Sequence, residues 1–184
     1  MNIGRMVREG FVAGLVGAAA VAAWFLIVDT VAGRPLFTPA ALGSFFFWGT
    51  RDPAGVQIAV PAVAAYTLLH IILFFAVGFV GAGLAQAVES FPPALFIVLV
   101  VVAVFEFAFF LLLALVARPL LGALTWWSVA GGNALAVIAM VRYFWRAHPV
   151  LREKILAHPL GAAMTNLSME RLKKSQEPGK PPAP

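Results

Sequence analysis

The sequence contains no cysteine among its 184 residues, and charged residues of either sign are few. The absence of cysteine excludes disulfide bonds, thiolate nucleophiles and cysteine-ligated metal or iron–sulfur sites. Only 11% of the residues are charged, whereas soluble domains have about 25%. Hydrophobic residues make up 62% of the chain, above the roughly 45–50% of soluble domains. A water-soluble fold of this length cannot bury so much apolar surface, so we expect lipid to surround part of it.

Known catalytic motifs are also missing. The chain has no Walker loop, no G-x-S-x-G, no H-E-x-x-H and no dinucleotide-binding fingerprint. The run GFVGAG at 78–83 lies inside an apolar segment, which argues against a phosphate-binding loop. The basic C-terminal region is short and lacks interleaved aromatic residues, so nucleic acid is not an expected partner. We therefore expect a protein that is not an enzyme.

Long apolar runs are what the sequence has instead. A membrane-spanning helix needs about 20 mostly apolar residues. Four segments satisfy this requirement, at about 11–31, 58–87, 94–117 and 121–145. Turn-forming stretches rich in Pro and Gly separate them. The first run exceeds the usual length of a signal-peptide core, so we expect it to be a retained helix.

This pattern predicts an all-α integral membrane protein built as a four-helix transmembrane bundle. We expect the transmembrane domain at 1–147 and a cytoplasmic tail at 148–184 that is amphipathic and then disordered. Arg5 and Arg8 precede the first span, and a longer basic series begins at Arg142. Because basic residues favour the cytoplasmic side, both termini should be cytoplasmic, in a bacterial inner membrane.

The first outer loop, 33–57, is long and apolar in its middle, TPAALGSFFFWG. Thr38 is suited to cap a short helix with Pro39 in its first turn. We expect an interfacial or re-entrant segment here. Its aromatic residues would insert into lipid or a partner: Phe45, Phe46, Phe47 and Trp48. Two interpretations remain open, an aromatic belt anchor and a lid over a cavity between the helices.

Polar residues inside the spans are rare enough to be candidates for function. At 1.5 Å per residue, His70, Glu106 and Asn133 each fall near the middle of a span. A charged group there costs roughly 2.5–3.5 kcal/mol, so it should face the bundle interior and be paired. We expect Glu106 to pair with His70 on the adjacent antiparallel helix, with Asn133 completing the network. Tyr66 lies one turn from His70 and can share its face.

Asp29 lies nearer the outer end of the first span, where Arg34 is the natural partner for an ion pair. His70 is the only histidine inside a span, which makes it the candidate ligand for a haem, a metal or a pigment. A metal site would have to combine His70, Glu106 and Asp29, and this set is short of ligands.

Small residues recur at four-residue spacing in the first, second and fourth spans, as at Gly14 and Ala18, Gly78 and Ala82. Such residues let helix backbones approach closely in lipid. The third span is bulky instead, and outside the Glu106 stripe it should meet lipid or another subunit.

Our leading hypothesis is a non-enzymatic membrane subunit that packs against partner membrane proteins or itself, with bound lipid and a buried layer of His70, Glu106, Asn133, Tyr66 and Asp29. The alternatives are a small proton-coupled transporter or channel that uses Glu106 and His70, and a haem-, metal- or pigment-binding subunit that uses His70.

Overall fold

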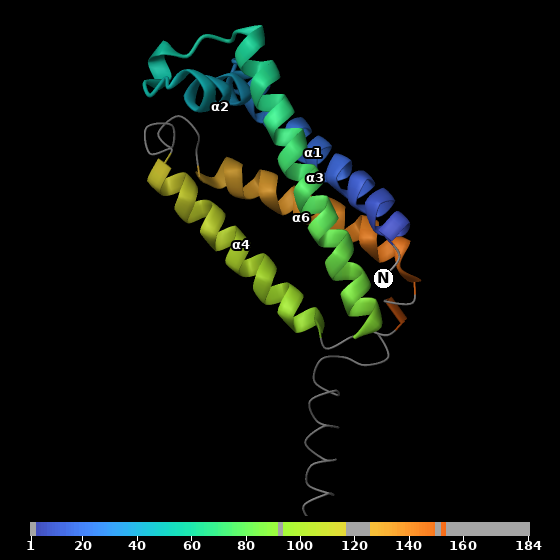
Figure 1. Ribbon diagram of the computed structural model, residues 1–184. Helices are drawn as coiled ribbons and strands as arrows, with labels where there is room; N and C mark the ends of the chain where they lie inside the picture. The colour runs from blue at the N-terminus through green and yellow to red at the C-terminus, as the bar shows by residue number, and fades with distance from the viewer. Residues whose placement is uncertain (1–2, 92–93, 117–125, 150–151, 154–184) are drawn as a thin grey trace, which may run out of the picture.

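The computed structural model describes residues 3–91, 94–116, 126–149 and 152–153, and this part of the chain is helical with no β-strand (Figure 1). The helices and the short 3-10 turn η1 are, in chain order, α1 Ile3–Val31, α2 Phe37–Trp48, η1 Pro53–Gly55, α3 Val60–Ser90, α4 Ala94–Val116 and α6 Trp126–Ala147. Each predicted apolar segment therefore contains a helix, and the expected all-α class is confirmed.

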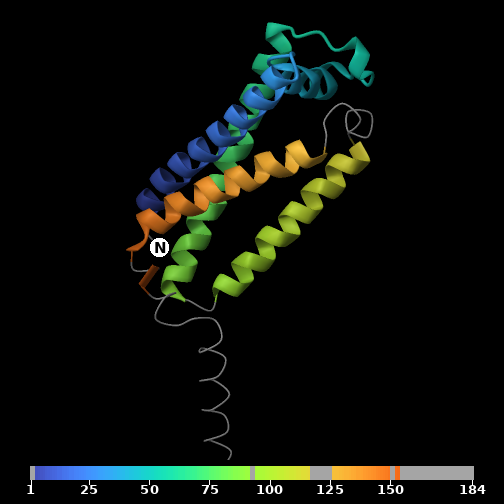
Figure 2. The ribbon, with the colours of Figure 1, turned by 180° about the vertical axis from the view of Figure 1, so that it is seen from behind.

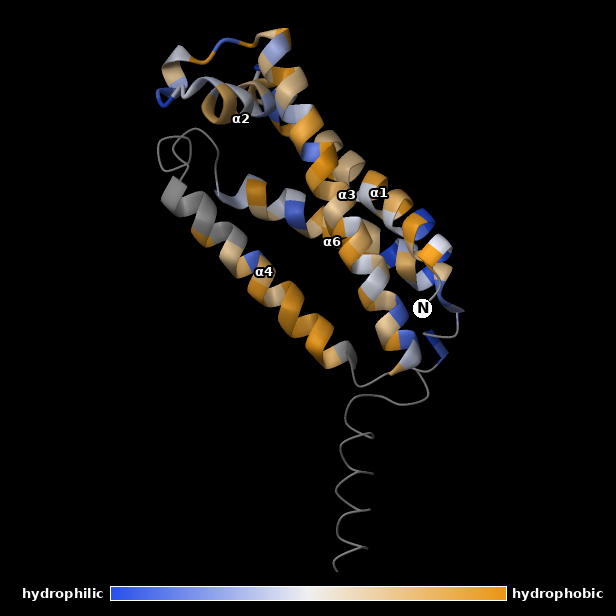
Figure 3. Cartoon of the chain, in the orientation of Figure 1, coloured by the Kyte–Doolittle hydropathy of each residue, from blue (hydrophilic) through white to orange (hydrophobic). Residues whose placement is uncertain are grey.

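Helices α1 and α3 are long and apolar enough to cross a membrane, and α4 contributes a shorter apolar stretch, Phe96–Ala108. In the most apolar 18 residues of each helix, only 28% of α1 and 11% of α3 is buried within the protein. Figure 3 shows apolar residues along most of α1, α3 and α4. The 29 residues of α1 extend for about 43 Å, longer than the roughly 30 Å hydrocarbon core of a bilayer.

Helices α1 and α3 lie side by side and antiparallel (Figures 1 and 2). Glycines allow their backbones to approach closely. A Cβ added at Gly78 would lie 2.6 Å from the backbone nitrogen of Gly14, and one added at Gly14 would lie 2.7 Å from the carbonyl oxygen of Phe74. The small-residue packing faces predicted for these two helices are thus in place.

Helix α6 crosses α1 through a second small-residue face. Its buried residues include four at four-residue spacing: Ser128, Gly132, Ala136 and Met140. The indole nitrogen of Trp24 on α1 donates a hydrogen bond to the carbonyl oxygen of Ser128 at 2.7 Å. A Cβ added at Gly131 would lie 2.7 Å from the Trp24 ring. The indole therefore fills the space that small residues leave on α6.

Helix α2 packs against the beginning of α3. Its buried residues Phe37, Ala41 and Leu42 form a small core, against which Phe45, Val56 and Tyr66 pack. The remaining aromatic residues of the run, from Phe46 to Trp48, are exposed.

The N-terminus of α2 differs from the prediction. We expected Thr38 to be the cap, but the helix begins at Phe37, with Leu36 in the left-handed conformation before it. The hydrogen bonds that a cap would provide come instead from a side chain on α1, described below.

Helix α4 is the least packed helix. Its described side chains are exposed except at Val98 and Glu106, which are half-buried. Figures 1 and 2 show α4 close to α3 where the two helices are joined and separate from it further along. α4 thus has apolar side chains exposed around most of its circumference.

Helix α6 ends at Ala147, where the sequence predicted the end of the transmembrane domain, and the chain beyond it begins inside the helical body. Sequence reasoning placed His148 at the start of the tail, yet His148 is 0% exposed and lies within the body. Most of the predicted amphipathic tail, 154–184, lies outside the described residues.

Candidate functional site

A buried ionic cluster joins the N-terminal end of α1 to the C-terminal ends of α3 and α6. We use the name ionic cluster for Arg5, Glu9, Glu89 and His148. Glu9 is 3% exposed and His148 is 0% exposed, so the centre of the cluster is shielded from solvent. Buried charges in proteins are costly unless they are paired and hydrogen-bonded, and these groups satisfy one another.

Each helix supplies one part of the cluster. Arg5 and Glu9 lie one turn apart on α1, and the Nε of Arg5 donates to Oε1 of Glu9 at 2.7 Å. Glu89 lies in the last turn of α3, and its Oε2 accepts from Nη1 of Arg5 at 3.4 Å. The Nη2 of Arg5 also donates to the carbonyl oxygen of Ala147, the last residue of α6, at 3.2 Å. Arg5 therefore binds all three helix ends together.

His148 sits between the two carboxylates. Its Nε2 lies 3.1 Å from Oε2 of Glu9, and its Nδ1 lies 3.1 Å from Oε2 of Glu89. An ionised carboxylate only accepts hydrogen bonds, so bonds at both ring nitrogens need a doubly protonated imidazolium. The Nη2 of Arg5 also lies 3.1 Å from Nδ1, a contact that suits a neutral ring.

The polar residues that the sequence singled out in mid-span do not form one network. Nδ2 of Asn133 on α6 donates to Oε2 of Glu106 on α4 at 3.1 Å. The Nε2 of His70 lies 3.3 Å from the carbonyl oxygen of Ala18 on α1 instead. Within the described residues, no hydrogen bond or ion pair joins His70 to Glu106. The predicted contact between His70 and Glu106 is therefore wrong, whereas the predicted contact between Glu106 and Asn133 is present.

The reason is the packing order of the helices. The glycine contacts hold α3 against α1, so His70 faces α1, while α4 diverges from α3. The His70 ring lies between two aromatic neighbours on its own helix, with centroids 5.7 Å from the Tyr66 ring and 4.7 Å from the Phe74 ring. Tyr66 does share a face with His70, as its spacing predicted, and it also packs against the α2 core.

Asp29 holds α2 in place rather than forming an ion pair. Its Oδ2 accepts from the backbone nitrogen of Thr38 at 2.7 Å, and its Oδ1 accepts from the Thr38 hydroxyl at 2.7 Å. A carboxylate at a helix N-terminus satisfies free N–H groups and interacts favourably with the helix dipole. Arg34, the expected partner, places its guanidinium carbon 3.9 Å from the centre of the Phe37 ring. The predicted Asp29–Arg34 ion pair is thus replaced by a capping contact and a cation–π contact.

The proposed metal ligands are separated as well. Asp29 contacts α2, His70 contacts α1 and Glu106 contacts α6. Among the described residues, no group of three or more metal-ligating side chains is arranged to hold a metal ion. The predicted three-residue site is therefore not formed.

No family model matches this chain, and no curated protein or solved structure shows significant similarity to it. The function must accordingly be argued from the residues themselves.

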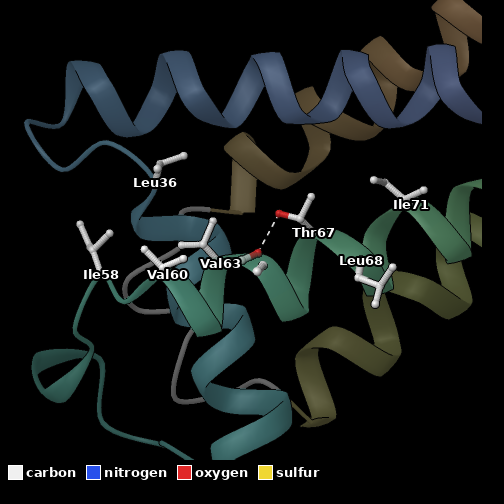
Figure 4. A pocket seen from close by; sticks show the side chains of 8 residues that line it. Leu36, Ile58, Val60, Val63, Thr67, Leu68 and Ile71 are labelled. Atoms are coloured by element: carbon white, nitrogen blue, oxygen red, sulfur yellow. Dashed lines mark hydrogen bonds between the residues drawn. The ribbon is translucent and has the colours of Figure 1, made fainter.

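An open apolar groove of about 560 Å³ lies beside the first turns of α3 (Figure 4). It is lined by Leu36, Ile58, Val60, Val63, Ala64, Thr67, Leu68 and Ile71. Thr67 has the only polar side chain in this lining, and its hydroxyl already donates to the Val63 carbonyl oxygen at 2.7 Å. The groove thus offers apolar contact and no free hydrogen-bonding group, which suits hydrocarbon rather than a polar substrate.

Sequence reasoning missed the ionic cluster. The sequence predicts Arg5 only as a basic flank of the first span and places residue 148 only at the start of the tail. Glu9 and Glu89 were not singled out. The available signal was the presence of acidic residues at the basic end of apolar segments, together with the four-residue spacing of Arg5 and Glu9. The chain separation of the other members, from residue 9 to residue 148, leaves no local pattern to detect.

Proposed function

We propose that the protein is a multi-pass integral membrane protein in which α1, α3, α4 and α6 each cross the bilayer. At 23 and 22 residues, α4 and α6 are about 34 Å and 33 Å long, enough for the hydrocarbon core. The exposed apolar side chains on all four helices support this proposal, since lipid is the solvent that accepts them. Asp29, His70 and Asn133 each take part in a hydrogen bond to another helix, which reduces the cost of polar groups in lipid.

The charge distribution supports an orientation with the ionic cluster on the cytoplasmic side. Arginines exposed at that end include Arg8, Arg142, Arg146 and Arg152. At the opposite end the structure describes only two arginines, Arg34 and Arg51. The positive-inside rule then places both chain termini in the cytoplasm, as in a bacterial inner membrane.

Within the membrane the protein acts as a non-enzymatic subunit, and α4 is the surface that binds a second copy. Glu106 carries this proposal. It lies in the middle of α4, and among the described residues only Asn133 donates to it, at Oε2. A carboxyl at mid-membrane depth with an unfilled acceptor is costly. A helix that docks on this face would supply the missing hydrogen bond.

A second copy is the occupant that best fits this requirement. Two copies with the same orientation place their Glu106 side chains at the same depth, and a two-fold axis brings equivalent residues together. If one carboxyl is protonated, it donates to the other, as in paired carboxyl groups that share a proton. A different partner would have to bring a donor to this depth. Proton transfer between Glu106 and His70 has less support, because the two side chains contact different helices.

The absence of cysteine makes the test direct, because any introduced cysteine is unique. Val102 lies one turn from Glu106 on the same face of α4, whereas Val104 lies on the opposite face. Both are exposed within one copy, at 37% and 61%. We expect oxidation of native membranes to cross-link Val102→Cys into a disulfide-bonded dimer and to leave Val104→Cys largely monomeric.

Equal cross-linking of the two variants, or none, would contradict the dimer. If Val102→Cys instead forms a disulfide with a different membrane protein, the protein is still a membrane subunit, but α4 binds that protein and not a second copy.

A further inference from the structure

The exposed arginines at the ionic-cluster end form a second surface with its own chemistry. We use the name basic rim for Arg8, Arg142, Arg146 and Arg152, all of which are exposed. The contact between Arg5 and Ala147 holds the start of α1 beside the end of α6. Arg8 lies one turn after Arg5 on α1, and Arg146 directly precedes Ala147 at the end of α6. The arginines of the two helices therefore belong to one surface.

The carboxylates near this surface are mostly engaged elsewhere. Glu9 and Glu89 are held by Arg5 and His148 inside the ionic cluster. Within the described residues, no ion pair involves any arginine of the basic rim, and Glu153, next to Arg152, is the exposed carboxylate at this end. The basic rim thus keeps a net positive charge that faces outward, and anions are its natural ligands.

One face of α6 joins this charge to an apolar strip. Leu135 and Ile138 are exposed at 40% and 62%, and Arg142 and Arg146 follow on the same face of the helix. Trp145 lies beside the two arginines and is 39% exposed. Tryptophan is typical of the headgroup layer, where its ring is partly in lipid and its N–H in water. The order along α6 is therefore two apolar side chains, then two arginines with the Trp145 ring between them in sequence.

We propose that this face of α6 binds an anionic phospholipid, with its acyl chains along Leu135 and Ile138 and its phosphate between Arg142 and Arg146. Guanidinium groups bind phosphate through paired hydrogen bonds. A zwitterionic lipid should bind less well, because its ammonium group is repelled by the positive charge of the arginines. A free phosphate ion would use the arginines but not the apolar strip. The inference depends on the membrane location proposed above and not on the second copy.

The test uses the full chain in nanodiscs made from phosphatidylcholine and phosphatidylglycerol, with the lipids retained on the released protein counted by native mass spectrometry. We expect wild type to retain phosphatidylglycerol preferentially. Arg142→Gln combined with Arg146→Gln should weaken this preference about thirtyfold, given the typical contribution of one basic side chain near an anionic surface. Arg51→Gln, at the other end of the molecule, should leave the preference unchanged.

Inorganic phosphate added in excess distinguishes the two sources of the anion. We expect it not to displace phosphatidylglycerol, because it cannot fill the apolar strip. Displacement by phosphate, equal retention of the two lipids by wild type, or an unchanged preference in the double variant would each overturn the proposal. Failure of the chain to enter nanodiscs would instead refute the membrane location, so the two proposals fail separately.

Discussion

Glu9→Gln should destabilise the protein strongly, although Glu9 lies within the first turns of the chain. The substitution keeps the size of the side chain and one acceptor oxygen, but it removes the negative charge between Arg5 and His148. Glu9 is 3% exposed and contacts these residues at 2.7 Å and 3.1 Å, so Arg5 and His148 would lose their charged acceptor without gaining water. Hydrogen bonds to charged groups contribute about 1.5–3 kcal/mol, and breaking a buried ion pair costs about 3–5 kcal/mol.

We therefore expect the free energy of unfolding to fall by about 3 kcal/mol, a large part of the roughly 5–15 kcal/mol of a typical domain. The assay is reversible unfolding in mixed detergent micelles by titration with sodium dodecyl sulfate, followed by tryptophan fluorescence. Glu153→Gln is the matched control, because it removes an exposed carboxylate at the same end and should change stability by less than about 0.5 kcal/mol.

A double-mutant cycle tests whether the effect arises from the cluster itself. His148→Gln alone should also destabilise, and the double variant Glu9→Gln/His148→Gln should lose less than the sum of the two, with a coupling energy of at least about 1 kcal/mol. If Glu9→Gln behaves like Glu153→Gln, or if the two effects are additive, the description of these residues as one buried, mutually satisfied cluster is wrong.

Three further substitutions test the packing and the polar contacts by the same titration. Gly78→Ala should lower the free energy of unfolding by about 1–3 kcal/mol, because its Cβ would meet the backbone of α1. Gly83→Ala should be neutral or slightly stabilising, since the nearest atom to its Cβ lies 3.9 Å away. Equal effects of the two substitutions would contradict the close approach of α1 and α3. Asp29→Ala should cost about 2 kcal/mol and speed amide hydrogen exchange in α2 in particular, and unchanged exchange there would refute its capping role. Asn133→Ala should lower the free energy of unfolding by only about 0.6 kcal/mol, because the proposed second copy also donates a hydrogen bond to Glu106. A loss above about 2 kcal/mol would mean that Asn133 is the sole donor to Glu106.

The helices were predictable because each depends on a local property, a run of about 20 apolar residues bounded by turn-forming residues. The glycine and alanine spacing within α1, α3 and α6 also predicted which faces pack, since small residues are what permit close backbone approach. Both features can be read from a short window of sequence.

The partners of individual polar residues could not be read in this way. Sequence adjacency suggested that α3 and α4 would pack along their lengths and bring His70 to Glu106, but Gly14 and Gly78 hold α3 against α1. The ionic cluster combines residues from both ends of the chain, and only Arg5 and Glu9 are close enough in sequence to be recognised as a pair. Which side chains meet depends on helix rotation and tilt, and these follow from packing contacts distant in sequence.

The most direct test of the account is the mass of the wild-type protein after extraction with its surrounding lipid into polymer-bounded nanodiscs, measured by native mass spectrometry after release from the disc. We predict a complex of two chains of 19.6 kDa each in the wild type, and a single chain for Glu106→Leu, which removes the carboxyl proposed to join the two copies. A single chain of 19.6 kDa in the wild type, at every protein density in the membrane, would contradict the account.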